Sequence, residues 1–241
     1  MNRIFKIHAS QCWKIMGRIG LTDKQIAQLD ELEAKATLTK NQQETMYDLR
    51  RKRDNPELPQ TCITFLKEWY ADDQEQVYSK YLAKGIMMEQ EAIDLMARVL
   101  GYGVAEKNQE QKEDAYFIGT CDVKLDKPVV DVKCPWDKKS FLDNTYGMDP
   151  QYIWQGRVYM PLYKKKKFIL FYGLMDTPAE LNNEMEVVFS DLPDSERWIA
   201  YQINHDPKIV REIRERVKLC RKWLAKYDKF IKANTGKILT P

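Results

Sequence analysis

Gly119-Thr120-Cys121-Asp122 and, after a short spacer, Val129-Val130-Asp131-Val132-Lys133 are the stretches that decide the fold. Both are typical of β-strands, and each supplies a carboxylate. Side chains alternate along a strand, so Asp131 and Lys133 share one face of a sheet, and Asp122 can point to the same face. A charge within an apolar strand is costly unless it is paired or binds a metal ion. The pattern indicates either a metal-dependent phosphodiesterase site or a structural Asp–Lys pair on an edge strand.

A third carboxylate, Glu89, lies at the start of a run that is predicted to be helical. Apolar residues recur there at spacings of three to four, at Ile86, Ile93, Met96 and Leu100. Glu89 falls near the stripe of Ile86 and Ile93, which predicts that its carboxylate faces inward, an unusual position for a charge. The alternative is that Glu89 only interacts with the positive N-terminus of the helix.

A further helix is predicted from Pro150 to Met160, with Gln155 and Tyr159 one turn apart on one side. In chain order, the motifs are a helix with a glutamate, a G-x-x-D strand, a D-x-K strand and a Q-x-x-x-Y helix. Together they resemble the PD-(D/E)xK nuclease superfamily and, within it, the lambda-exonuclease or YqaJ-like viral recombinase nucleases. The segments Lys133-Cys134-Pro135 and Ile7-His8-Ala9-Ser10 are also similar to that family. The resemblance extends from about residue 3 to about residue 175.

Two positions depart from the family pattern. Cys121 stands where proline usually precedes the first strand aspartate, and Asp131 stands where glutamate is common. Neither departure removes a ligand. A single thiol among hard oxygen ligands is better explained as a packed small residue than as a soft-metal ligand, so Cys121 is interpreted as structural.

The pattern and the resemblance together predict an α/β (α+β) fold with a restriction-endonuclease-like core, in which helices flank a small mixed β-sheet. A single nuclease domain over residues 1–241 is expected. Strands are predicted near Tyr116–Lys124, Val129–Lys133, Phe168–Leu174 and Met185–Phe189, and helices at Thr61–Tyr70 and from Gln74 to Leu100. A helical insertion at about 21–58 forms an arm, either a packed hairpin or a contact to DNA. Asp206-Pro207 begins a basic helix at about 206–233.

Composition narrows the class of protein. The 241 residues are 44% hydrophobic, enough for one substantial core, and no apolar run approaches the roughly 18 residues that span a bilayer. The five cysteines are scattered without a C-x-x-C pair, which argues against zinc, disulfide or iron–sulfur sites. Net charge is only +3, but bases cluster at Lys164–Lys167 and from Lys208 to Lys232. These clusters either hold phosphates or are solvated surfaces.

The resemblance also implies roles for the site residues. Asp122 and Asp131 would bind Mg²⁺, with Mn²⁺ as a substitute, and the backbone carbonyl of Val132 would be a further ligand. Glu89 would join through a second ion or an ordered water. Lys133 should stay protonated beside two carboxylates and would stabilise hydroxide and the developing negative charge.

Further roles are implied for residues around this centre. Gln155 would support Lys133 or the scissile phosphate. Tyr159 would line the same DNA groove, with core packing as the alternative. Arg3 and Ser10 occupy positions similar to those with which the family grips a terminal phosphate, and His8 either contributes or serves only packing.

The function implied is a Mg²⁺-dependent DNA exonuclease that hydrolyses duplex DNA from an end, with 5′–3′ polarity, in phage-type recombination by strand annealing. Implied partners are double-stranded DNA, a single-strand annealing protein and further copies of the chain, as a trimeric ring by analogy. The expected location is the bacterial cytoplasm, without membrane association, for a phage or prophage product. Two alternatives stay open: a structure-specific or repair endonuclease with the same site, and a catalytically decayed DNA-binding or assembly protein.

Overall fold

The computed structural model describes residues 3–72 and 79–236. Contacts divide the chain into two compact units. Among the described residues, the smaller unit comprises 14–72 and 218–236, and the larger comprises 3–13 and 79–217. Within the described residues, no helix is long and apolar enough to cross a membrane.

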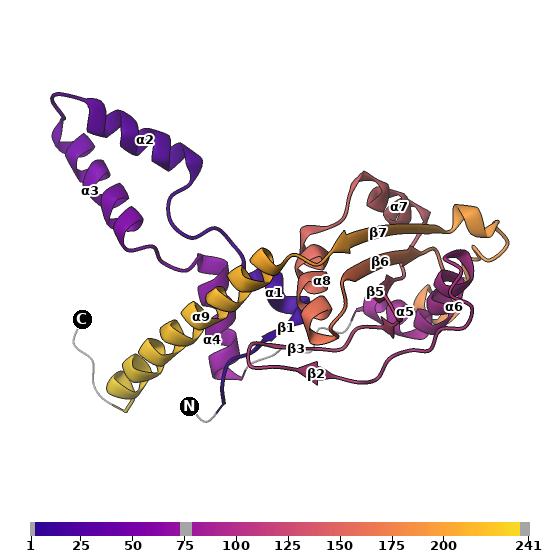
Figure 1. Cartoon of the computed structure of the whole chain (residues 1–241). Helices are drawn as coiled ribbons and strands as arrows, with labels where there is room; N and C mark the ends of the chain where they lie inside the picture. Colours follow the sequence, from indigo (N-terminus) through magenta and orange to yellow (C-terminus); the bar gives the residue numbers. More distant parts are fainter. Residues whose placement is uncertain (1–2, 73–78, 237–241) are drawn as a thin grey trace. The chain divides into compact units, whose positions relative to one another are not determined.

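The larger unit contains two small sheets (Figure 1). One has the order β4-β5-β6-β7, formed by Val123–Lys124, Pro128–Lys133, Lys167–Gly173 and Trp198–Asn204. Its central pair, β5 and β6, is parallel, and both outer pairs are antiparallel. The other sheet has the order β1-β3-β2, formed by Ile7–His8, Phe117–Gly119 and Lys112–Glu113, with β1 parallel to β3. Both sheets are therefore mixed, as predicted.

Helices cover the two faces of the four-stranded sheet. The α6 helix (Glu89–Val99) packs on the face that carries Val130, Val132 and Phe171. The α8 helix (Pro150–Leu162) lies on the other face, where Gly156 meets Phe168. A Cβ atom on Gly156 would lie 2.2 Å from Phe168 Cδ1, so only glycine allows this approach. Residues at alternate positions of β5 therefore face different helices.

The remaining elements of the larger unit connect these layers. Short helices are α5 (Lys80–Met87) and α7 (Lys138–Asp143), and single 3₁₀ turns are Ala9–Gln11, Asn144–Tyr146, Ala179–Leu181 and Asp194–Glu196. The chain crosses between the units within α1 (Cys12–Ile15) and α9 (Pro207–Asn234). Asp206 accepts a hydrogen bond from the backbone N–H of Lys208, so it caps α9 as the Asp-Pro pair predicts.

The smaller unit contains the predicted helical insertion, formed by α2 (Asp23–Ala34) and α3 (Lys40–Asp54), and then α4 (Gln60–Ala71). Capping boxes begin both helices of the hairpin, Thr22 with Gln25 and Thr39 with Gln42. The hairpin core consists of Leu21, Leu29, Leu32 and Leu49, with Leu38 and Met46 packed against it. The predicted pair of helices is confirmed, although Ile26 is largely exposed.

The prediction of one continuous helix up to Leu100 is wrong. The chain forms α5 and α6 separately, and Met88 breaks the helix with φ −97° and ψ 4°. Ile86 therefore belongs to α5 and is 64% exposed, although Ile93 of α6 is fully buried. The predicted start at Gln74 lies outside the described residues. A short-range apolar period cannot reveal a break at which the next helix changes direction.

The prediction of a strand at Met185–Phe189 is also wrong. Only Val187 makes an isolated bridge, to Thr177, because Met185 and Val188 are exposed and have no strand beside them. The outer strand is instead β7, which was not predicted. Its residues are mostly half-buried and carry no clear alternation, so pairing with β6 rather than local pattern makes it a strand.

Candidate active site

Strand β5 places Asp131 and Lys133 on the sheet face that α8 covers. Asp131 is 1% exposed, and its Oδ2 atom lies 2.5 Å from Lys133 Nζ as an ion pair. Among the described residues, no donor other than Lys133 reaches this Oδ2. Burial alone would lower the pKa of Lys133, but the charges of Asp131 and Asp122 outweigh it and hold that pKa above its usual value. Lys133 is therefore a cation at neutral pH.

Asp122 lies in the turn between β3 and β4, beside Asp131. Its Oδ2 atom accepts a hydrogen bond of 2.7 Å from the backbone N–H of Val132. Burial, followed by repulsion from the charge of Asp131, raises the pKa of Asp122 to about 8. Two ionised carboxylates would carry more negative charge than Lys133 alone balances, so Asp122 keeps its proton up to about pH 8, and a bound metal cation would replace that proton.

Gln155 and Tyr159 of α8 connect Asp131 to the turn that carries Asp122. Gln155 Nε2 donates to Asp131 Oδ1 at 2.9 Å and to the Tyr159 hydroxyl at 3.0 Å. The Tyr159 hydroxyl donates to the backbone oxygen of Thr120 at 2.7 Å. Burial raises the pKa of Tyr159, so it stays a neutral phenol. Tyr159 is 3% exposed and contacts Phe168, which favours the core-packing alternative over a groove-lining role.

Glu89 is the first residue of α6, at the edge of this centre. Its Oε2 atom lies 2.5 Å from Lys107 Nζ, and its side chain is 17% exposed. The charge of Glu89 also contributes to the raised pKa of Asp122, after burial and Asp131, so it acts on the same centre. Within residues 3–72 and 79–236, no three His, Cys, Asp or Glu side chains are gathered into a ready-made metal site. The structure therefore brings Asp122, Asp131 and Lys133 together and leaves Glu89 paired beside them.

The amino-terminal segment packs against the same region of the fold. Strand β1 pairs with β3, and a Cβ atom on Gly119 would lie 3.0 Å from Ala9 Cβ and 2.9 Å from Tyr159 Cε1. Ser10 follows on an exposed turn, where its Oγ atom is 2.9 Å from His8 Nδ1. Arg3 precedes β1 and is exposed. Ser10 thus lies beside the strand that leads to Asp122.

Solved structures share this fold. A phage-related exonuclease from Haemophilus somnus 129PT matches with a TM-score of 0.71 and 20% identity, over 95% of this chain and 97% of its own. The fold is that of phage-type exonucleases. The alkaline exonuclease LHK-Exo from Laribacter hongkongensis matches with a TM-score of 0.57 and 16% identity, over 98% of this chain and 96% of its own. The structure of LHK-Exo in complex with dAMP matches with a TM-score of 0.54 and 16% identity, over 97% of this chain and 95% of its own.

The predicted resemblance and the α+β, nuclease-like fold class are confirmed by these structures. No protein-family model matches the sequence. A comparison with curated proteins also gives no match. At such low identity the solved structures establish the fold alone, so activity has to be argued from the geometry of the site.

Asn108, Tyr163 and Lys107 support the site and were not predicted. The backbone N–H of Asn108 donates to the backbone oxygen of Asp122 at 2.7 Å, and Asn108 Nδ2 donates to that of Cys121 at 2.9 Å. The Tyr163 hydroxyl accepts from the N–H of Cys121 at 3.3 Å. Tyr163 follows Tyr159 by one helical turn, a spacing that sequence could have revealed. Asn108 and Lys107 lie in an irregular segment without periodic signal.

Cys121 is fully buried within this support. Burial raises the pKa of its thiol to about 12, so the thiolate that a soft metal needs is not formed near neutral pH. The geometry agrees with its interpretation as a packed residue.

Proposed function

We propose that the chain is a Mg²⁺-dependent DNA exonuclease that hydrolyses duplex DNA from an end. The observation that carries the proposal is the pair Asp122 and Asp131 with Lys133 at its side, in a fold shared with exonucleases. Nothing in the packing of β5 requires a buried ion pair beside a second carboxylate, and such groups are costly unless they serve a purpose.

The residues present fit a divalent cation. Asp131 Oδ2 is paired with Lys133 alone, and burial and the charge of Asp131 disfavour ionisation of Asp122. Carboxylate oxygens are the ligands that Mg²⁺ prefers, and Mg²⁺ keeps several waters, so two protein carboxylates suffice. Asp122 and Asp131 would hold the ion, with the carbonyl of Val132 as a further ligand and Mn²⁺ as a substitute. Glu89 would contribute after leaving Lys107, through a second ion or a water.

The chemistry then divides among the residues of the site. A bound Mg²⁺ would neutralise charge on the phosphate and would lower the pKa of a coordinated water. Lys133, held as a cation by Asp131 and Asp122, stabilises hydroxide and the charge that develops on the phosphate. Gln155 fixes the orientation of the Asp131 carboxylate through Oδ1, and so positions the site rather than reacting.

An enzyme that hydrolyses duplex DNA from an end must recognise that end, for example through its terminal phosphate. Ser10, on the exposed turn beside β3, and Arg3 supply a hydroxyl and a guanidinium for charge-assisted hydrogen bonds. Binding of a 5′-phosphate by these two residues would give the hydrolysis 5′–3′ polarity. LHK-Exo, which has this fold, was solved in complex with dAMP, and this supports binding of a deoxynucleotide by such a scaffold.

The wider role proposed is phage-type recombination by strand annealing, with a single-strand annealing protein as partner and a bacterial host cytoplasm as location. The name of the phage-related neighbour supports this setting. A homo-oligomer, a trimeric ring by analogy, belongs to the same proposal.

Cleavage of linear duplex against covalently closed circular duplex tests the exonuclease assignment. Degradation of the linear DNA in Mg²⁺, with intact circles, is the expected result. Efficient cutting of closed circles would contradict end-dependent attack and favour an endonuclease. Absence of cleavage of either DNA would favour a binding protein on a decayed fold.

A further inference from the structure

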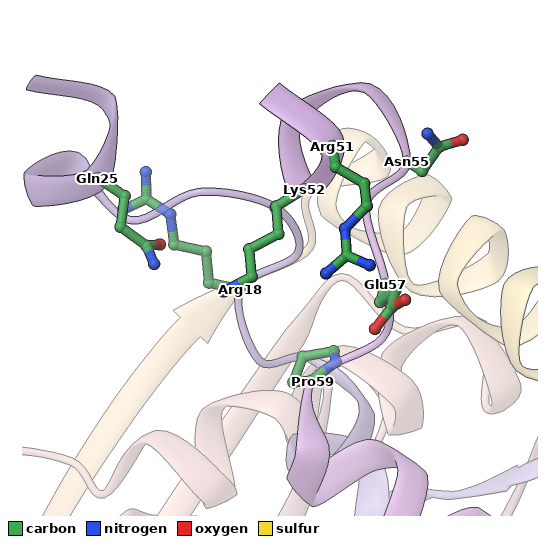
Figure 2. A pocket seen from close by; sticks show the side chains of 8 residues that line it. Arg18, Gln25, Arg51, Lys52, Asn55, Glu57 and Pro59 are labelled. Atoms are coloured by element: carbon green, nitrogen blue, oxygen red, sulfur yellow. The ribbon is translucent and has the colours of Figure 1, made fainter. Parts of the chain in front are cut away.

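A basic groove lies within the helical hairpin of the smaller unit, where no catalytic residue lies. Eight residues line a cavity of about 430 Å³ (Figure 2), and six of them are polar or charged: Arg18, Gln25, Arg51, Lys52, Asn55 and Glu57. Three are cations and one is an anion. Arg51 and Lys52 come from the last turn of α3, and Arg18 comes from the loop before α2. Figure 2 shows the Arg18 side chain beside Gln25, and Arg51 and Lys52 extending from the end of α3.

A second cavity adjoins the first. It measures about 510 Å³ and shares Arg18 and Gly20 with the first. It adds Arg53 and Asp30 to the lining, together with apolar residues of the loop and of α2. Across both cavities four cations therefore stand against two carboxylates. The two cavities share part of their lining and are together called the groove. Cations spread over two cavities suit several phosphates better than a single anion.

The cations of this groove have at most exposed or half-exposed carboxylate partners. Arg53 pairs with Asp54 at 2.9 Å and with Glu33 at 3.3 Å, and its side chain is 48% exposed. Lys52 has no carboxylate partner among the described residues, and Arg51 Nη2 is 3.6 Å from Asp48 with both side chains more than 60% exposed. Arg18 pairs with Asp23 at 2.8 Å, but their side chains are 47% and 91% exposed. Exposed pairs of this kind contribute little free energy, so a phosphate can replace the carboxylate.

We propose that this groove, formed by Arg18, Arg51, Lys52 and Arg53, binds backbone phosphates of duplex DNA, independently of the catalytic carboxylates. The choice of DNA rests on the proposed function. The amide groups of Gln25 and Asn55 add hydrogen-bond donors for phosphate oxygens, and the absence of an aromatic side chain from the lining favours backbone contact over base stacking.

Binding of a fluorescent duplex in EDTA, over a range of salt concentrations, tests this assignment without any cleavage. Removing Arg51 and Lys52 together, by Arg51→Gln and Lys52→Gln, should weaken binding roughly tenfold or more near 0.1 M salt. The slope of log K against log salt should fall by about one to two. The matched control is Lys24→Gln with Lys40→Gln, which removes two exposed lysines of the same hairpin that line neither cavity.

Three results would overturn the assignment. The slope could be unchanged in the groove variant, the control could lose as much affinity as the groove variant, or inorganic phosphate at constant ionic strength could displace the duplex as well as added DNA does. The last result would indicate a site for a single anion. Failure of the proposed function is separate, because it would be seen as lack of cleavage by the unaltered chain while the binding difference persists.

A second, independent observation concerns Lys84, a fully buried cation in α5. Its Nζ atom lies 2.9 Å from the backbone oxygens of Pro135 and Trp136 and 2.7 Å from that of Met175. It is also 2.7 Å from Thr177 Oγ1. Burial lowers the pKa of Lys84 to about 8. Among the described residues no carboxylate forms an ion pair with it, so backbone dipoles compensate its charge.

These contacts join the two segments that carry the catalytic residues. Lys84 lies in the helix that ends just before Glu89, whereas Pro135 and Trp136 follow β5, which carries Asp131 and Lys133. Trp136 also packs edge-on against Tyr81 of α5, with ring centroids 5.3 Å apart. We infer that Lys84 is a positioning residue, which sets Glu89 relative to Asp131 in the site of the proposed function.

Calorimetric titration with Mg²⁺ tests this role, because it measures the site without turnover. Lys84→Met should weaken Mg²⁺ binding about tenfold and leave the KM for DNA unchanged, and Lys84→Arg should restore part of the affinity. Where Lys84→Met fails to fold, Thr177→Val removes one contact and keeps the charge. The control is Ile169→Val, a core change on the face of α6 without contact to Lys84.

Unchanged Mg²⁺ affinity in the folded Lys84 variant would overturn the inference, as would an equal loss in Ile169→Val. Absence of Mg²⁺ binding by the unaltered chain would instead contradict the proposed function.

Discussion

The raised pKa of Asp122 predicts that the metal-free protein loses stability as pH rises. Burial and the charge of Asp131 place the folded-state pKa of Asp122 at about 8, against an ordinary value of 3.8. Between these values the folded state holds a proton that the unfolded state has released. Stability contributed by a proton held only in the folded state falls with rising pH, so this contribution is complete below pH 3.8 and lost above about pH 8.

The magnitude follows from linkage. A difference of one bound proton changes the free energy of unfolding by about 1.4 kcal/mol per pH unit. Between about pH 5.5 and about pH 7.5 the metal-free protein should therefore lose about 2 to 3 kcal/mol through this carboxyl. Burial lowers the pKa of His8 and of His205, which titrate in the same window with the opposite sign. A difference between two proteins is therefore needed to isolate Asp122.

The assay is urea unfolding of the unaltered chain and of Asp122→Asn in EDTA at both pH values. Asparagine keeps an oxygen for the N–H of Val132 but cannot ionise. The unaltered chain should lose about 2 to 3 kcal/mol more than Asp122→Asn on going to the higher pH, and Mg²⁺ should remove the difference. Equal pH dependence of the two proteins in EDTA would show that the folded state does not hold a proton on Asp122 at neutral pH.

Three further predictions follow from single side chains. Lys133→Ala should lower the cleavage rate by roughly a hundredfold or more while DNA affinity, measured by fluorescence anisotropy in Ca²⁺, stays close to normal. An equal fall in affinity would make Lys133 a phosphate anchor instead. Gly156→Ala should reduce the free energy of unfolding by about 2 to 3 kcal/mol in urea, because the new Cβ meets the Phe168 ring at 2.2 Å. A neutral result would mean that α8 moves away freely. Arg3→Ala should erase most of the rate advantage of 5′-phosphorylated over 5′-hydroxyl ends in a nucleotide-release assay. A preserved advantage would exclude Arg3 from end recognition.

The parts of the fold that sequence predicted are those with a strong local signal. Strand β5 has five consecutive buried residues, and each hairpin helix begins at a capping box whose Thr-x-x-Gln pattern is visible in the sequence. Strand β7 and the break at Met88 carry no such signal, since one depends on its partner β6 and the other on how α6 packs. Contacts between segments that are distant in sequence determine these two features, and the local sequence pattern does not reveal such contacts.

The candidate site likewise contains residues that a local spacing predicts and residues that no local spacing predicts. The two-residue spacing of Asp131 and Lys133 fixes a common face, and the four-residue spacing of Gln155 and Tyr159 fixes another, so these residues were predictable as groups. A hydrogen bond that holds the backbone of Asp122 comes from Asn108, in an irregular segment far from it in sequence. Such a contact depends on the path of a loop, which no periodicity encodes.

The most direct test of the catalytic site is Mg²⁺-dependent release of nucleotides from a linear duplex by the unaltered chain and by Asp131→Asn. Asparagine retains an oxygen for Gln155 while it removes the buried charge that would hold the ion, so the fold should persist by circular dichroism. We expect release by the unaltered chain in Mg²⁺, none in EDTA, and a loss of roughly a thousandfold or more in Asp131→Asn. Near-normal release by the folded Asp131→Asn variant would contradict this expectation.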